Sequence, residues 1–181
     1  MPEVEVRSSR IEGLGVFACR SFRAGERIRR VNVVREITAE APIRQDLGES
    51  VDHCSYPDGK VVLWGSPDRH VNHSCDPNAW LLYDPDALPY FVARHDIAAG
   101  DEVTCDYSIN AGEGGGWPCN CGSARCRRVI EGGFFGLPGE LRQQYRPFLA
   151  EWFVRRNRER LMDAGLTLVR NGPSGPTSGC S

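Results

Sequence analysis

Three cysteines stand close together in one polar segment of the chain, at Cys119, Cys121 and Cys126. Zn²⁺ is held by four tetrahedral ligands, with thiolate sulfur at about 2.3 Å, so three clustered thiols need a fourth partner from elsewhere. The alternative is three free thiols, but the neighbouring Gly122 and Ser123 offer little apolar surface in which to bury them. The spacing therefore predicts a zinc loop that takes one more ligand from another segment.

A second group of reactive side chains forms the dense polar run at 69–78, with the sequence Arg-His-Val-Asn-His-Ser-Cys-Asp-Pro-Asn. Apolar segments flank this run, and polar groups are costly to bury unless each finds a partner. The pattern therefore favours a ligand site that includes Asn72 and His73. Taken alone, His73 is equally compatible with a structural histidine held by hydrogen bonds.

A third segment, 100–107, ends on a tyrosine. Val103, Cys105 and Tyr107 alternate with polar residues, which predicts a strand with these three side chains on its inner face. Tyr107 is thus a candidate pocket residue, and the alternative is an ordinary half-buried aromatic side chain.

Short apolar runs separated by turns must position these segments. Strands are expected near residues 4–6, 16–18, 31–37, 61–64, 80–83 and 90–93, and a short helix within 38–52. Strands this short and evenly spaced predict a mainly β fold of several small sheets.

The chain changes character after residue 110. A Gly-rich stretch at 112–116 precedes the cysteine loop, and an apolar stripe over 138–163 predicts one helix that begins at Pro138. Its Trp152 and Phe153 either complete the domain or mediate dimerisation. The last residues, rich in Gly, Pro and Ser, are expected to be disordered.

The composition argues against several classes of protein. The 181 residues carry a net charge of −2, so no strong field draws the chain toward nucleic acid or acidic membranes. There is no apolar run of about 18 residues for a membrane span, and the N-terminus lacks the apolar core of a signal peptide. A cytoplasmic location is expected, or a nuclear one in a eukaryote, where eight cysteines favour metal binding over disulfides.

Four segments occur in one order along the chain, at 13–18, 69–78, 97–107 and 119–127. Together they resemble a SET domain followed by a post-SET zinc loop, as found in protein-lysine methyltransferases. The resemblance covers residues 3–130 and implies several small curved sheets with a pseudoknot-like core. The expected division is a SET domain (1–110), a Gly-rich link with the post-SET zinc loop (111–130), a C-terminal helical extension (131–165) and a disordered tail (166–181).

The resemblance implies transfer of a methyl group from S-adenosylmethionine to the side-chain amine of a lysine in a protein or peptide, for which a basic tail is one candidate. Tyr107 matches the catalytic tyrosine, which orients the amine. The positions implied to bind the cofactor are Glu12, Gly13, Leu14, Asn72, His73, Tyr107 and Asn120. Cys75 is implied as the fourth ligand, beside Cys119, Cys121 and Cys126, of one structural zinc ion.

The chain departs from the family pattern in the lysine channel, where Cys105 replaces the usual Phe or Tyr. The smaller side chain leaves more room, which favours transfer of more than one methyl group. In the variable segment 38–68, His53 or Tyr56 is expected to approach the cofactor. The side chains that offer either an acidic groove for a basic tail or a solvated face are Asp84, Asp86, Asp96, Asp101 and Glu102.

Two other functions stay open. A SET-like module can keep its zinc and bind partners without catalysis, although Tyr107, Asn72 and His73 are all present here. A methyltransferase of this kind can also act on a small molecule, and the size and near-neutral charge of the chain neither favour nor exclude that.

Overall fold

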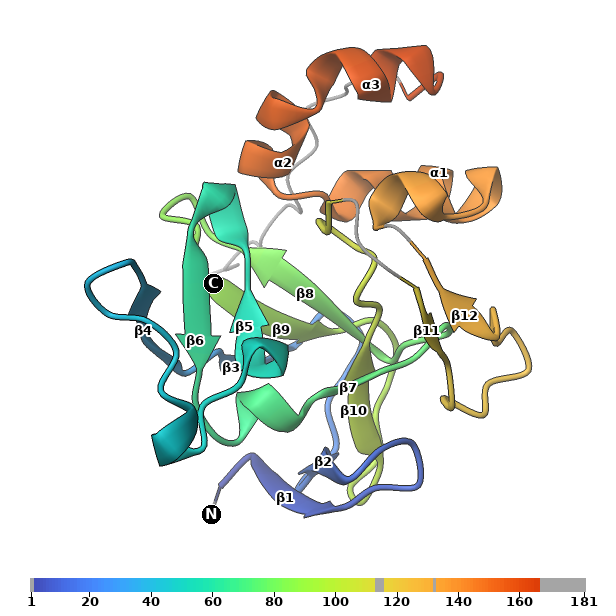
Figure 1. The fold of residues 1–181 in the computed structure, drawn as a ribbon. Coiled ribbons are helices and arrows are strands. Elements are labelled where there is room, and N and C mark those ends of the chain that lie inside the picture. The colour runs from blue at the N-terminus through green and yellow to red at the C-terminus, as the bar shows by residue number, and fades with distance from the viewer. Residues whose placement is uncertain (1, 113–115, 132, 167–181) are drawn as a thin grey trace, which may run out of the picture.

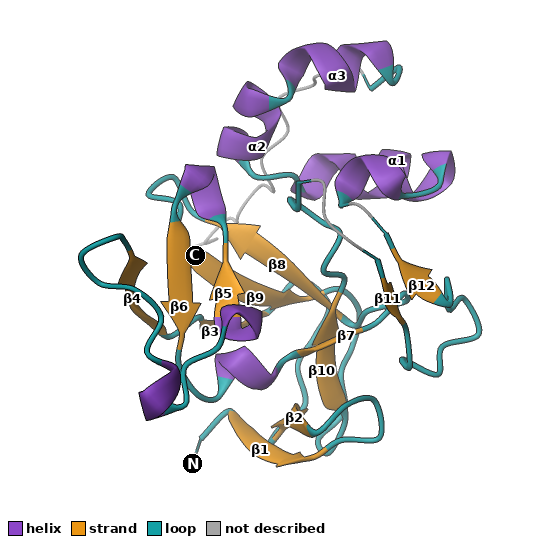
Figure 2. Cartoon of the chain, in the orientation of Figure 1, coloured by secondary structure: helices purple, strands orange, loops and turns teal. Residues whose placement is uncertain are grey.

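The chain folds into several small β-sheets, with its α-helices at the C-terminal end (Figure 1, Figure 2). The computed structural model describes residues 2–112, 116–131 and 133–166. Within them, the mainly β architecture predicted from the short apolar runs is confirmed. The strands are β1 (Val4–Ser8), β2 (Leu14–Ala18), β3 (Arg27–Arg30), β4 (Val33–Ile37), β5 (Cys54–Ser55), β6 (Val61–Trp64), β7 (Asn72–His73), β8 (Ala79–Tyr83), β9 (Pro89–Ala93), β10 (Glu102–Cys105), β11 (Trp117–Pro118) and β12 (Val129–Ile130).

These strands form four separate sheets, with the strand orders β1-β2-β10-β7, β3-β9-β8, β4-β6-β5 and β11-β12. The strand predicted over 31–37 begins only at Val33. The reason is a local contact, because the backbone N–H of Asn32 donates to the buried carboxylate of Asp68 (2.9 Å) and so leaves the strand pairing.

Strand β10 occupies the inside of the four-stranded sheet. It runs antiparallel to β2, with Val103 opposite Val16, and parallel to β7, with Cys105 opposite His73. Residues 103–106 are all buried, so the predicted alternation of an inner and an outer face is wrong for this strand. A strand covered on both faces buries every side chain, whatever its place in the alternation.

The C-terminal segment is built from short helices. They are α1 (Gly139–Tyr145), α2 (Glu151–Arg156) and α3 (Arg158–Asp163), with a 3₁₀ turn at Arg146–Phe148. The single helix predicted over 138–163 is therefore wrong. Pro147 has no backbone N–H to donate within a helix, and Leu149 and Ala150 take extended conformations directly after it.

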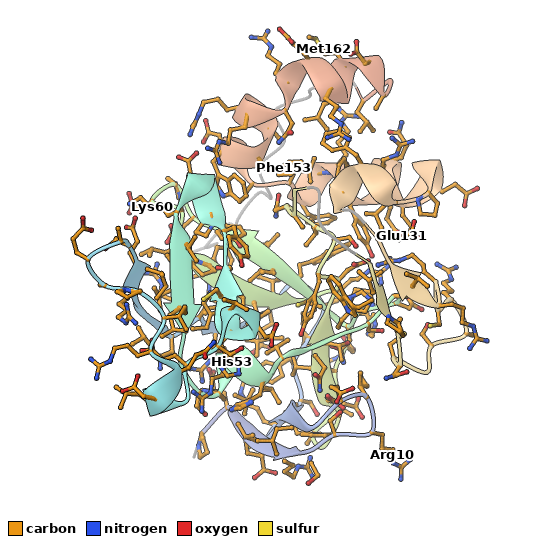
Figure 3. All side chains as sticks on the ribbon, viewed as in Figure 1. Arg10, His53, Lys60, Glu131, Phe153 and Met162 are labelled. Carbon is orange, nitrogen blue, oxygen red and sulfur yellow. The ribbon has the colours of Figure 1, made fainter. Side chains whose placement is uncertain are left out.

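The helix expected within 38–52 is likewise replaced, by two 3₁₀ turns at Gln45–Leu47 and Val51–His53. Trp152 and Phe153 are buried inside the chain, at 8% and 2% exposure. Figure 3 labels Phe153 at the C-terminal helices. The two side chains complete the domain, and little of either is left exposed for a dimer interface.

Two hydrophobic cores lie on opposite faces of the β8–β9 hairpin. Along β8, Ala79 and Leu81 contact the first core, whereas Trp80 and Leu82 contact the second, as strand alternation requires. The first core contains Val4, Val16, Ala18, Phe22, Ile28, Val31, Val71, Ala79, Phe91, Ala93, Ile97, Val103 and Cys105. The second core contains Trp80, Leu82, Ile109, Phe134, Leu137, Tyr145, Ala150, Trp152, Phe153, Leu161 and Leu166.

Part of the predicted organisation lies outside the described residues. Most of the Gly-rich link, 113–115, and nearly all of the predicted disordered tail, 167–181, belong to it. Leu166, the first residue of that predicted tail, is instead buried in the second core at 1% exposure. Among the helices that the structure describes, none has the length and apolar character to cross a membrane.

Candidate active site and metal centre

Four cysteine thiols come together beside β7. Cys75 follows this strand, and Cys119, Cys121 and Cys126 lie on the loop between β11 and β12. All four sulfur atoms lie within 4.8 Å of one another, and those of Cys75 and Cys119 are 3.7 Å apart. A tetrahedral site with sulfur at about 2.3 Å has ligand-to-ligand edges of about 3.8 Å, so this donor set fits Zn²⁺. The structure thus joins the loop cysteines with the fourth residue implied by the resemblance.

Protein hydrogen bonds also point at these sulfur atoms. The backbone N–H of Arg127 donates to Cys75 Sγ (3.3 Å), and that of Arg128 donates to Cys126 Sγ (3.4 Å). Burial opposes ionisation of Cys121, but two backbone N–H groups and the neighbouring thiols outweigh burial and lower its pKa to about 7. Burial raises the pKa of Cys75 and of Cys119, so the N–H donors favour the thiolate, the form that binds a metal, chiefly at Cys121.

His73 connects the thiol cluster to the end of β10. Its Nδ1 accepts the backbone N–H of Tyr107 (3.1 Å), so the ring proton sits on Nε2, which donates to Cys75 Sγ (3.3 Å). Burial lowers the pKa of His73 to about 4, against an opposing effect of Asp106 and with a further decrease from Arg127. The imidazole is therefore neutral at pH 7. Its side chain acts as a hydrogen-bonded structural group, and the cofactor contact through its backbone stays a prediction.

Asn72 holds the loop that precedes β2. Its Nδ2 donates to the carbonyl oxygens of Glu12 (3.2 Å) and Leu14 (3.0 Å), and to Glu102 Oε1 (2.8 Å). The Glu102 carboxylate lies so close to Gly15 that a Cβ there would clash with it, which explains the glycine. The exposed loop predicted to bind the cofactor is therefore fixed by a side chain of the polar run. Sequence reasoning missed this role of Glu102.

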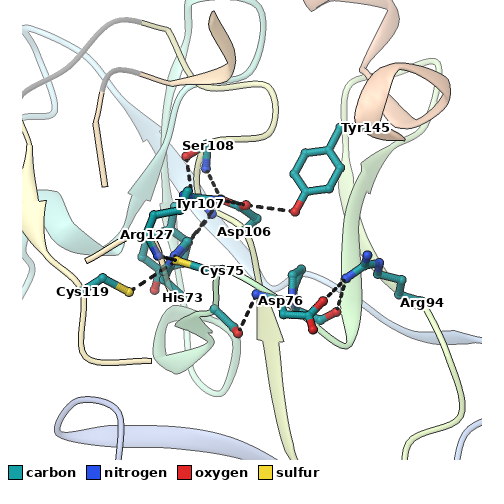
Figure 4. Close-up of polar contacts among 12 residues, drawn as sticks. His73, Cys75, Asp76, Arg94, Asp106, Tyr107, Ser108, Cys119, Arg127 and Tyr145 are labelled. Carbon is teal, nitrogen blue, oxygen red and sulfur yellow. Dashed lines mark hydrogen bonds and ion pairs between the residues drawn. The ribbon is translucent and has the colours of Figure 1, made fainter. Parts of the chain in front are cut away.

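Tyr107 lies just beyond the end of β10. Within the otherwise buried stretch 103–110 it is 42% exposed, and its hydroxyl donates to the Val71 carbonyl (2.6 Å). Its ring packs edge-on against His73, with centroids 5.3 Å apart, and lies 6.4 Å from the ring of Trp117. This half-open aromatic side chain is held by the segment that also carries the candidate ligand residues His73 and Cys75 (Figure 4), and its role in a pocket stays a prediction.

The phenol of Tyr107 keeps its proton. Burial within the site raises the pKa of Tyr107, and the nearby Cys105, Glu102 and Asp52 act in the same direction. A neutral phenol that donates its hydrogen to a carbonyl still has oxygen lone pairs with which to accept a hydrogen bond. The geometry therefore suits a tyrosine that orients a partner group, and it does not suit a phenolate base.

Asp106 is the centre of a buried polar network that the sequence did not reveal. Arg127 donates to both carboxylate oxygens (2.6 and 2.9 Å), Tyr145 Oη donates to Oδ2 (3.0 Å), and the backbone N–H of Ser108 donates to Oδ1 (3.0 Å). Burial raises the pKa of Asp106, but the bonds from Arg127 and Ser108 outweigh it and lower the pKa overall. A charged carboxylate at the end of a buried strand needs such partners. The position of Asp106 within the predicted strand was therefore the one sign of this network in the sequence.

A model of the SET domain family matches residues 13–108, which is more than half of the chain. This chain belongs to the SET domain family. Histone-lysine N-methyltransferase ash1 of Drosophila melanogaster is 34% identical over 55% of this chain and 5% of its own length. Histone-lysine N-methyltransferase 2B of Homo sapiens is 30% identical over 70% of this chain and 5% of its own length. The chain therefore spans only a small part of the curated relatives that it matches.

The crystal structure of a Plasmodium falciparum protein, described there as a histone methyltransferase, superposes with a TM-score of 0.48 at 24% identity. The superposition covers 59% of this chain and 94% of that one.

Four residues that the sequence singled out lie apart from the hydrogen-bonded network of this SET domain. Cys105 is buried in the first core at 2% exposure, and Asn120 is exposed between two cysteines of the thiol cluster. His53 packs edge-on against His70, with ring centroids 6.3 Å apart, and Tyr56 is 59% exposed. Their roles toward cofactor and substrate stay predictions.

Four of the five acidic side chains considered for a groove, all but that of Asp86, are occupied by local contacts. Asp84 pairs with Arg30 (2.8 Å), and Asp96 accepts the backbone N–H of Ala24 (2.8 Å). Asp101 likewise accepts the backbone N–H of a neighbour, Ala98 (3.0 Å), and Glu102 is bound to Asn72. These contacts favour the alternative of a solvated face.

Proposed function

We propose that this SET domain transfers a methyl group from S-adenosylmethionine to the side-chain amine of a lysine in a protein or peptide. One observation carries the proposal, namely that each of the three consecutive residues 71–73 makes hydrogen bonds to a different part of the proposed site. The Val71 carbonyl accepts a hydrogen bond from the Tyr107 hydroxyl. The Asn72 side chain donates to the carbonyls of Glu12 and Leu14. The His73 ring accepts the backbone N–H of Tyr107 and donates to Cys75 Sγ in the thiol cluster. Catalytic tyrosine, cofactor loop and metal centre are thereby joined at one short segment.

The residues of the chain have two tasks in this reaction. A lysine amine has a pKa of about 10.4 and must lose its proton before it can attack, which a poorly solvated channel favours. The Tyr107 oxygen accepts an N–H of the neutral amine and so points its lone pair at the methyl group. When bound, S-adenosylmethionine supplies the methyl, its S–CH₃ bond breaking to a neutral thioether as the N–CH₃ bond forms. The methylated nitrogen then releases its extra proton to water.

The thiol cluster is proposed to hold one zinc ion through Cys75, Cys119, Cys121 and Cys126. Four protein ligands fill a tetrahedral zinc site and leave no open position for a substrate or for water. The ion would therefore stabilise the loop between β11 and β12, beside Tyr107 and its neighbour Trp117, and would take no part in the chemistry.

Histone tails are the proposed substrate class, because the similar proteins are named histone-lysine N-methyltransferases. The same names favour a nuclear location over the cytoplasmic one that the sequence also allows. The near-neutral net charge of −2 provides no strong field toward nucleic acid, so direct nucleic-acid binding is not expected. Cys105, in place of a bulkier aromatic residue, supports transfer of more than one methyl group.

The test is calorimetric titration of the purified chain with S-adenosylhomocysteine, together with a zinc assay and methyl transfer to histone peptides. Binding of the nucleoside, one zinc per chain and methylated lysine are the expected results. A zinc-loaded chain that binds no S-adenosylhomocysteine would instead be a silent interaction module. A chain that binds it and methylates only small amines would have a different substrate class.

A further inference from the structure

A tyrosine outside the SET family match reaches the edge of the proposed active site. Tyr145 ends helix α1, beyond the matched residues 13–108, and it is fully buried. Its hydroxyl donates to Asp106 Oδ2 (3.0 Å), and Asp106 directly precedes Tyr107 (Figure 4). The C-terminal segment thus contributes one hydrogen bond to the carboxylate beside the catalytic tyrosine.

The same carboxylate is hydrogen-bonded to the loop between β11 and β12, which carries three of the four clustered cysteines. Arg127 donates two hydrogen bonds to Asp106, one to each oxygen, and a third to Ser108 Oγ (3.2 Å). The backbone N–H of Arg127 donates to Cys75 Sγ, one of the four proposed zinc ligands. Asp106 therefore lies between Tyr107 and the thiols, and Tyr145 donates to Oδ2, the oxygen that also accepts from Arg127 Nη1.

The position of the Tyr145 hydroxyl is fixed by rigid packing. Its ring contacts Trp80 edge-on, with centroids 5.2 Å apart, on the second core's side of β8. Nearby, the backbone N–H of Ala150 donates to Asn110 Oδ1 (2.7 Å), a second buried bond between the helical segment and the chain just after Tyr107. Two buried attachments and a packed ring hold the phenol on Asp106.

We propose that Tyr145 is a positioning residue for the methyl transfer proposed above, on which this inference rests. Through Asp106 it fixes the backbone that carries Tyr107 and the arginine that bonds Cys75. The C-terminal helices thereby contribute a positioning residue to the proposed active site. A hydrogen bond to a charged group contributes enough that its loss is expected to lower kcat about tenfold.

The test compares two variants of the full chain, Tyr145→Phe and Phe148→Leu. Tyr145→Phe removes only the hydroxyl and keeps the ring on Trp80. Phe148 stacks on the same Trp80 ring, with centroids 4.1 Å apart, and the structure shows no contact of it with Asp106 among the described residues. Phe148→Leu therefore weakens the same packing without touching the network.

Tyr145→Phe is expected to lower kcat about tenfold at an unchanged KM for S-adenosylmethionine, and to speed zinc loss to a chelator. Phe148→Leu is expected to lower the melting temperature at least as much, with kcat and zinc loss unchanged. An unchanged kcat in Tyr145→Phe, or equal losses of kcat in the two variants, would overturn the proposal. If the wild-type chain transfers no methyl group, the proposed function fails, and zinc loss alone decides whether Tyr145 acts on the metal loop.

Discussion

The two hydrophobic cores of this SET domain use the same hairpin in different ways. The first core, on one face of β8 and β9, surrounds Cys105 and the strands that carry the motif residues. The second core, on the other face, joins Trp80 to the C-terminal helices, which have no counterpart in the family match. A hairpin that is apolar on both faces needs a second layer, and the C-terminal segment provides it.

The two cores differ in how they contact the residues of the proposed active site. The first core supports Tyr107 and Asn72 directly, through strands β7 and β10. The second core reaches the site at a few polar points, chiefly the bond between Tyr145 and Asp106. The predicted boundaries at residues 110 and 130 stay predictions, but the packing of the second core crosses both of them.

Removing the proposed zinc ion is the change with the largest expected effect, since zinc binding to small four-ligand sites contributes about 10–16 kcal/mol. A chelator should abolish binding of S-adenosylhomocysteine and expose the amides of 117–130 to hydrogen exchange. The first core should keep its protection, because its side chains do not depend on the metal. Cys19→Ser, at a thiol outside the cluster, is the control and should keep its zinc. A metal-free chain that still binds the nucleoside normally would contradict the coupling.

Truncating one large residue in each core tests whether the cores form one folding unit. Trp80→Ala in the second core and Phe91→Ala in the first should each lower the free energy of unfolding by about 3–5 kcal/mol. If the shared hairpin couples the cores, both variants unfold in one transition by calorimetry. A separate early transition in Trp80→Ala alone would show that the second core is an independent layer. Val34→Ala, at an exposed side chain, is the control.

Tyr107→Phe separates chemistry from packing. Loss of the hydroxyl should lower kcat about a hundredfold, equivalent to about 2.7 kcal/mol, because Tyr107 is the group proposed to orient the amine. The melting temperature should change little, since only the bond to the Val71 carbonyl is lost. Methyl transfer to a histone peptide, measured at saturating cofactor, gives the comparison with Tyr145→Phe, whose loss should be smaller. Activity at the wild-type level would remove Tyr107 from the mechanism.

Enlarging Cys105 is expected to have a modest effect on stability and a visible effect on the number of methyl groups in the product. Cys105→Tyr overfills a buried position of the first core, at a cost of about 1–3 kcal/mol. Mass spectrometry should show more than one methyl group per lysine for the wild type and fewer for the variant. Monomethyl-lysine as the sole wild-type product would disprove the inference about channel size.

Sequence reasoning succeeded where the signal was local. The cysteine spacing predicted a loop whose thiols lie together, and short apolar runs predicted small sheets. The ligand site that the polar run favours stays a prediction. The helix break at Pro147 was visible in the sequence, but the apolar stripe continued across it because α1 and α2 bury the same kind of face. The missing backbone N–H of Pro147 interrupts the helix although the apolar period continues past it.

The network around Asp106 could not be predicted because its members are far apart in the chain. Arg127 lies 21 residues after Asp106, and Tyr145 lies 39 residues after it. No helical or strand period links such positions, and each side chain has an ordinary local explanation. Only the three-dimensional packing of the second core brings Tyr145 to the carboxylate.

The two-residue pairing of β7 with β10 has a consequence for the order of folding. The β8–β9 hairpin lies between these strands in sequence, so local contacts of the hairpin can form early, while β7 meets β10 only after a long loop has closed. Residues 71–73 then acquire their bonds to the tyrosine, the loop before β2 and the thiol in the same event. A nascent or partly unfolded chain is therefore expected to have no half-active form, and competence for catalysis should emerge all at once, late in folding.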